Sequence, residues 1–241
     1  TPTQTSTPTQ TSYCEVVLEY QGISGTGYSS PYGFTFNSDG TKLGLNFGAG
    51  GFNIYDWASK TLDTTYSVWS ENETSYDSTN GYIYNSGYHF INVITGSTSS
   101  DFKQISTAPY GSRPNIFNPD DTNVYAIYNN RINRYDRYLN FFEYASLSYS
   151  DYEYTAIIYN NNNGYIYTLS PDGILYYKHL GGGSYDQNFI PFPWLGTSGY
   201  DASDLKYDST SYLLYASLFS GTTDFTVVVD TVTSNIIDTV Y

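Results

Sequence analysis

Aromatic side chains gather in four of five irregular segments of this 241-residue chain, and they are the first groups on which binding chemistry could be built. The segments span residues 23–32, 70–75, 108–113, 149–154 and 194–203. Aromatic rings of this kind stack on sugar rings or anchor contacts with a protein partner. We predict a ligand-binding surface made of Tyr28, Tyr32, Tyr110, Tyr152, Trp194 and Tyr200.

Three of these segments carry the acidic residues Glu71, Glu73, Asp151, Glu153 and Asp201, and Asp204 directly follows the last segment. A glycoside hydrolase needs two carboxylates roughly 5 to 10 Å apart across the sugar, so this activity is one alternative. No Gly-x-Ser-x-Gly elbow occurs, and the two histidines, His89 and His179, fall in separate repeats that do not favour a shared zinc site. We therefore predict no catalytic residue, no metal site and no cofactor.

These segments must be positioned by the repeated elements between them. Each repeat has one aromatic residue, one Asn or Asp, a polar turn and an apolar residue. The five copies lie at residues 36–43, 76–83, 117–124, 159–166 and 207–214. Tyrosine follows the apolar position at Tyr84, Tyr125, Tyr167 and Tyr215. The Asn or Asp positions are 40, 41, 42 and 48 residues apart, which is the length of a four-stranded propeller blade.

Short β-branched and aromatic runs separated by Gly, Asn, Asp and Pro predict an all-β chain. In each repeat we expect an inner strand before the aromatic-Asn pair and a second strand on the apolar segment. Third strands are expected at 52–56, 89–94, 131–136, 174–179 and 225–230. Outer strands are expected at 66–69, 102–106, 142–147, 188–192 and 236–240. The fold prediction is a β-propeller of five four-stranded blades over residues 14–241, or of six or seven if the native chain is longer.

The repeated Asn and Asp residues are interpreted as turn formers. Asp39-Gly40, Asn80-Gly81 and Asn163-Gly164 supply residues that tolerate the positive φ of tight hairpins. The run 160–163 offers clustered amide oxygens, but no EF-hand-like spacing accompanies it. Arg131, Arg134 and Arg137 alternate between strand faces, so they predict a solvated edge and not one basic patch.

The stretch 36–43 followed by Phe52-Asn53-Ile54-Tyr55-Asp56 resembles the YVTN-type repeats of surface-layer β-propellers. These repeats read F-S-P-D-G-T-x-L and then an apolar strand that ends in Asp. Residues 117–124 with Arg134-Tyr135-Asp136, and Val227-Val228-Val229-Asp230, fit the same scheme. The second and fourth repeats lack the terminal Asp. The resemblance spans about residues 20–241 and implies a blade architecture, without an activity.

One further strand is expected at residues 15–20, although the fifth repeat already has an outer strand of its own. Either this segment closes the ring by pairing with the last blade, or the native protein continues past residue 241. Residues 1–13, rich in Thr, Pro and Gln, are expected to form a linker or stalk.

Charge and composition limit the partners. The formal net charge of −14 excludes a nucleic-acid role that depends on a basic surface. No apolar run approaches the 18 or so residues that a membrane span needs, so membrane insertion is not expected. Cys14 is the only cysteine, which excludes an intrachain disulfide. Asn72 in Asn72-Glu73-Thr74 is the predicted N-glycosylation site.

Together these features predict an extracellular, non-enzymatic binding or adhesion module on a cell envelope, an appendage or a virion surface. Its partner is expected to be a glycan or a cell-surface protein, within a larger surface assembly. The alternatives are a structural subunit of a surface lattice or capsid, and a five-bladed-propeller glycosidase.

Overall fold

The computed structural model describes residues 33–37, 39–47, 51–66, 74–77, 80–87, 90–94, 102–106, 112–119, 122–128, 131–146, 155–181, 184–194, 201–219 and 223–241. These residues form five antiparallel sheets of four strands each, with no helix among them, so the prediction of an all-β chain is confirmed. No helix in this part of the chain is long and apolar enough to cross a membrane. The stalk at 1–13, the strand expected at 15–20 and the sequon at Asn72 lie outside the described residues.

Each sheet takes four consecutive strands of the chain in order. The first contains β1 (Gly33–Phe36), β2 (Lys42–Asn46), β3 (Phe52–Asp56) and β4 (Thr61–Tyr66). The second contains β5 (Thr74–Asp77), β6 (Tyr82–Gly87), β7 (Phe90–Ile94) and β8 (Phe102–Ser106). The third contains β9 (Ser112–Asn118), β10 (Asn123–Tyr128), β11 (Arg131–Asp136) and β12 (Phe141–Ser146). The fourth contains β13 (Ala156–Asn160), β14 (Tyr165–Ser170), β15 (Gly173–Gly181) and β16 (Ser184–Pro191). The fifth contains β17 (Asp201–Asp208), β18 (Leu213–Phe219), β19 (Asp224–Asp230) and β20 (Asn235–Val240).

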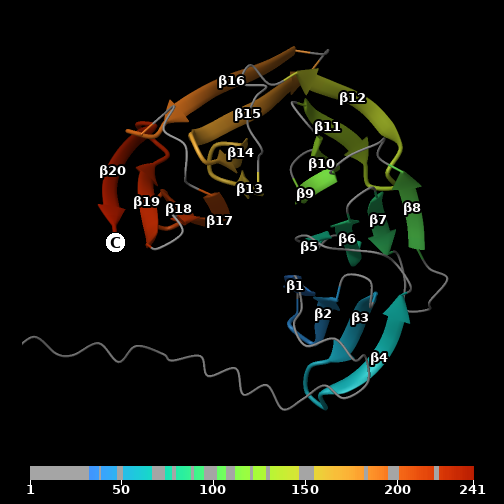
Figure 1. Ribbon diagram of the computed structural model, residues 1–241. Helices are drawn as coiled ribbons and strands as arrows, with labels where there is room; N and C mark the ends of the chain where they lie inside the picture. Colours follow the sequence, from blue (N-terminus) through green and yellow to red (C-terminus); the bar gives the residue numbers. More distant parts are fainter. Residues whose placement is uncertain are drawn as a thin grey trace, which may run out of the picture.

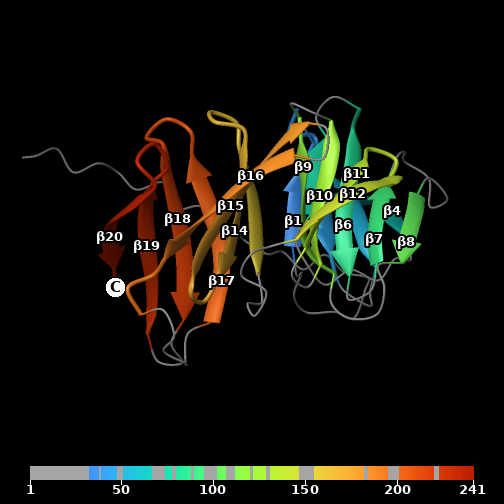
Figure 2. The ribbon, with the colours of Figure 1, turned by 90° about the horizontal axis from the view of Figure 1, so that it is seen from above.

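The sheets follow one another in an arc, with the first strand of each sheet toward the middle and the fourth strand outside (Figure 1). Figure 2 shows the strands standing upright, so the hairpin turns gather at two opposite ends of the molecule. The turns between first and second strands share one end with those between third and fourth strands. The turns between second and third strands lie at the other end, because consecutive strands are antiparallel.

The core is divided into layers between neighbouring sheets. Phe52 of β3 and Ile83 of β6 belong to one buried cluster that joins the first two sheets. Between the second and third sheets, the Tyr84 ring stacks on Phe117 with ring centroids 5.7 Å apart. Similar clusters join the third sheet to the fourth and the fourth to the fifth. Three of the four repeated tyrosines, Tyr84, Tyr125 and Tyr167, are almost completely buried and thus structural, whereas Tyr215 is half-buried.

The strand predictions are confirmed closely for β8 and β11, whose bounds match the expected segments. The outer strand expected at 66–69 begins earlier than predicted, because β4 runs from Thr61 to Tyr66, and residues 67–69 lie outside the described residues. The reason lies in the preceding turn, where Asp56 binds Ser59 and Lys60 has a φ of 59°, so the chain reverses early. The following strand is mostly exposed and polar, and therefore carries little of the apolar signal that a sequence pattern relies on.

The Asp residues that end the third strands organise the turns to the outer strands. Asp56 Oδ1 accepts hydrogen bonds from Ser59 N and Ser59 Oγ at 2.9 and 2.8 Å. Asp136 Oδ1 accepts from the backbone of Tyr138 and Asn140, and Asp230 Oδ1 accepts from that of Val232. A carboxylate that accepts several hydrogen bonds stays ionised to lower pH. Accordingly the pKa of Asp56 is lowered to about 2, first by the Ser59 amide, then by its hydroxyl, with Lys42 adding to the effect.

These turns predict a loss of stability in acid. The pKa values of Asp56 and Asp230 are lowered in the folded chain, so their contribution is complete above the ordinary Asp pKa of about 3.9 and is lost as pH falls toward 2. The free energy of unfolding, measured with urea between pH 5 and pH 2, should fall over this window. In Asp56→Asn, the free energy of unfolding should fall less between pH 5 and pH 2 than in the wild type. An equally steep fall would contradict the stabilising role of the Asp56 carboxylate.

Gly173 marks the tightest backbone approach in the fourth sheet. A Cβ at this position would lie 2.4 Å from the backbone oxygen of Ile190 and 2.5 Å from the Phe189 ring. Because the backbone cannot yield as a flexible side chain would, Gly173→Ala should destabilise the fold by about 1 to 3 kcal/mol. Chemical denaturation measures this loss. Ser184→Ala, at an exposed position of β16 in the same sheet, is the matched control and should change stability by less than about 0.5 kcal/mol; equal effects would contradict the packing argument.

Candidate functional site

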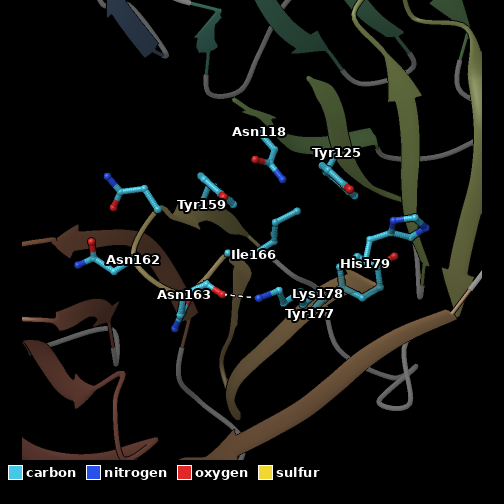
Figure 3. Close-up of a pocket in the computed structure, with 11 residues that line it drawn as sticks. Asn118, Tyr125, Tyr159, Asn162, Asn163, Ile166, Tyr177, Lys178 and His179 are labelled. Atoms are coloured by element: carbon cyan, nitrogen blue, oxygen red, sulfur yellow. Dashed lines mark hydrogen bonds between the residues drawn. The ribbon is translucent and has the colours of Figure 1, made fainter. Parts of the chain in front are cut away.

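A cavity of about 360 Å³ opens where the third and fourth sheets meet, near the turn from β13 to β14. Its size is at the lower end of the range for small-molecule sites. Its walls come from β9, β10 and β13 to β15. The residues that line it are Asn118, Tyr125, Tyr159, Asn161, Asn162, Asn163, Gly164, Ile166, Tyr177, Lys178 and His179. Figure 3 shows Asn118, Tyr125 and Tyr159 across the cavity from Asn163, Lys178 and Tyr177.

The inner wall is aromatic and buried. Tyr125 of β10 and Tyr177 of β15 are each at most 2% exposed, and their rings meet edge to face with centroids 6.2 Å apart. Ile166 belongs to the same buried cluster as both tyrosines. This wall is part of the core between the two sheets, so its shape is fixed by the packing that holds the sheets together.

The rim is the turn at residues 161–164, and hydrogen bonds hold it in one shape. Gly164 has a φ of 75°, a conformation that suits glycine, and its amide donates to Asn160 O at 2.8 Å. Asn163 Oδ1 accepts from the Tyr165 amide at 3.0 Å, while Asn163 Nδ2 donates to the Tyr167 hydroxyl at 3.0 Å. The rim is therefore preorganised, which lowers the entropy cost of binding a ligand.

Asn162 ties the rim to the fifth sheet. Its Nδ2 donates to the Tyr207 hydroxyl at 2.7 Å and to Ser209 O at 2.8 Å. The adjacent Asn161 is exposed and its side chain makes no hydrogen bond with the described residues. Asn161 therefore keeps an amide donor and an amide acceptor that a ligand can use.

Lys178 lies beside the rim. Its Nζ donates to Asn163 O at 2.7 Å, a bond drawn in Figure 3, and lies 5.3 Å from the centre of the Tyr165 ring. Asp186, which faces Lys178 across the β15–β16 pair, accepts a hydrogen bond from the Tyr165 hydroxyl at 2.5 Å. That bond, followed by burial, raises the pKa of Tyr165 to about 12, so this hydroxyl keeps its proton at physiological pH.

His179 joins the lining of the cavity to the third sheet. Arg134 Nη1 lies 2.9 Å from His179 Nε2, so this contact connects β11 with β15. A guanidinium has only donors, so Nε2 accepts and the imidazole proton resides on Nδ1. Arg134 is half-buried, and so the prediction that the arginine segment is simply a solvated edge is wrong for this residue: the neighbouring sheet supplies an acceptor that the sequence alone does not reveal.

The structure describes one of the six predicted ligand-binding aromatics. Trp194 is half-buried, its Nε1 donates to Pro171 O at 3.2 Å, and its ring meets Phe225 edge to face with centroids 5.1 Å apart. Pro171 follows β14, so Trp194 lies at the end of the molecule opposite the cavity. Tyr28, Tyr32, Tyr110, Tyr152 and Tyr200 lie outside the described residues, so their role stays a prediction.

The predicted acidic residues are described only in part. Asp201 and Asp204 lie on β17, and Asp204 Oδ1 is 3.1 Å from Lys206 Nζ. Glu71, Glu73, Asp151 and Glu153 lie outside the described residues. Sequence reasoning did not select the cavity residues, because the run 160–163 has a sufficient explanation as a turn. The sequence did contain one signal that could have drawn attention to this turn. It carries only amides, whereas the corresponding turns of the other repeats carry carboxylates.

A scan against protein-family models matches no family, and a search of curated proteins finds no related sequence. The YVTN-type resemblance therefore stays a prediction from the sequence.

The hydrogen bonds of the rim predict that two adjacent asparagines, Asn161 and Asn162, contribute differently to the free energy of unfolding. Asn162→Ala removes the hydrogen bonds to Tyr207 and Ser209 and should lower the free energy of unfolding by about 1 kcal/mol. Asn161→Ala, the matched control, removes no such bond and should change it by less than about 0.5 kcal/mol. Urea unfolding of both variants provides the measurement. Equal losses would contradict the bridging role of Asn162.

Proposed function

We propose that this chain is a β-propeller that acts as an extracellular, non-enzymatic binding module and recognises a glycan on a cell envelope, an appendage or a virion surface. The arc of five sheets, each with its first strand innermost, supports a radial arrangement of five blades (Figure 1). Six or seven blades remain the alternative for a longer native chain. The observation that carries the binding role is the preorganised cavity at the junction of the third and fourth sheets.

The chemistry of the lining favours a sugar over an apolar ligand. Asparagine amides both donate and accept hydrogen bonds, which matches hydroxyl groups that do the same. Tyr159, which is half-buried, adds ring surface against which the C–H face of a sugar can pack. The concave shape suits a ligand that enters the wall, whereas a protein partner would usually need a broader surface.

A binding role fits this cavity better than hydrolysis. Among the described residues that line it, none is Asp or Glu, whereas glycoside hydrolysis usually takes two carboxylates on opposite sides of the scissile bond. The lattice-subunit alternative has support of its own, because outer strands expose large apolar side chains. Leu62, Phe141, Ile237 and Val240 are 49 to 56% exposed, and such surfaces are used in contacts between subunits.

Binding to an array of immobilised glycans tests the proposal. The wild-type chain should retain a defined subset of glycans, and Asn161→Trp should weaken that binding at least about tenfold by filling the mouth of the cavity. Val232→Trp is the matched control, because Val232 is 72% exposed in the β19–β20 turn and does not line the cavity. Retention of no glycan, or equal losses in the two variants, would contradict glycan binding in this cavity.

A further inference from the structure

The cavity differs in charge from the rest of the chain. The protein has 23 acidic residues and nine Lys and Arg residues, giving a formal net charge of −14. In contrast, the described residues of the lining include Lys178 and no carboxylate. A concave site that holds a positive charge attracts a ligand of the opposite sign, and its low-dielectric walls strengthen that attraction.

Two cationic side chains approach the cavity from different sheets. The Lys178 ammonium reaches the rim from the fourth sheet, where it is fixed by Asn163 O and lies over the Tyr165 ring. The Arg134 guanidinium belongs to the third sheet and stands behind His179. The nearest acidic neighbour of Lys178 in the sheet register, Asp186, is engaged by the Tyr165 hydroxyl and is not part of the lining.

The contacts of Lys178 leave it able to bind an anion. An ammonium group has three donors, and one of them is used by Asn163 O. The Tyr165 ring attracts the cation but does not neutralise its charge. A negative group on a ligand at the rim would thus add a charge-assisted hydrogen bond, which is stronger than a neutral one.

We propose that the ligand of this cavity is an acidic sugar, a saccharide unit that carries a carboxylate, and that Lys178 at the rim is its principal charge partner. The hydroxyl groups of such a sugar would meet the asparagine amides, and its ring would face Tyr159. This inference rests on the proposed glycan-binding function and names the chemical class of its ligand.

The test uses an array that pairs each acidic sugar with its neutral parent, such as glucuronic acid with glucose and galacturonic acid with galactose. The wild-type chain should bind the acidic member of at least one pair about tenfold more tightly, and added salt should reduce this preference. Lys178→Gln should remove the preference by weakening binding of the acidic member. Lys178→Arg, which retains the charge, should keep most of it.

Lys206→Gln is the matched control, because it removes the same charge from the exposed surface of β17. Thermal unfolding of each variant shows whether a loss of binding reflects a loss of folding. Equal binding of acidic and neutral members would overturn the inference and leave the glycan-binding function standing. A preference that survives Lys178→Gln, or falls equally in Lys206→Gln, would also overturn it. Binding of neither member would contradict the proposed function itself.

Discussion

The structure depends on burying the face of each sheet against the face of its neighbour. A four-stranded sheet has two faces, and one sheet alone could not remove its apolar side chains from water. Here each sheet buries its faces against the sheets before and after it. Phe117 of the third sheet packs on Tyr84 of the second, and Tyr125 of the third packs on Tyr177 of the fourth. The cavity exists because this packing is incomplete at one end of one such contact.

The repeat pattern was sufficient to predict the sheets. The spacing of Asn and Asp residues gave the length of each unit, and apolar segments such as the one at β11 gave strand positions, because buried alternation and turn chemistry are both local signals. The start of β4 was not predicted, because this strand lacks these local signals. Its residues are exposed and hydroxyl-rich, so their place in the sheet is set by the Asp56 turn and not by burial.

The candidate site could be predicted far less well. The cavity needs Tyr125 and Tyr177, which are 52 residues apart and meet only because two sheets face one another. The contact between Arg134 and His179 has the same origin. Local patterns contain no information on which faces adjoin. Asn161 and Asn162 look equivalent as turn residues, yet only the second reaches the neighbouring sheet.

The position of the cavity between two repeats has a consequence for how such a protein can diversify. The rim is a surface turn of the fourth repeat, while the wall is core shared with the third, so rim residues can be exchanged without disturbing the packing that defines the wall. A chain built from similar units can therefore acquire a new specificity at one junction while the others continue to serve only as scaffold.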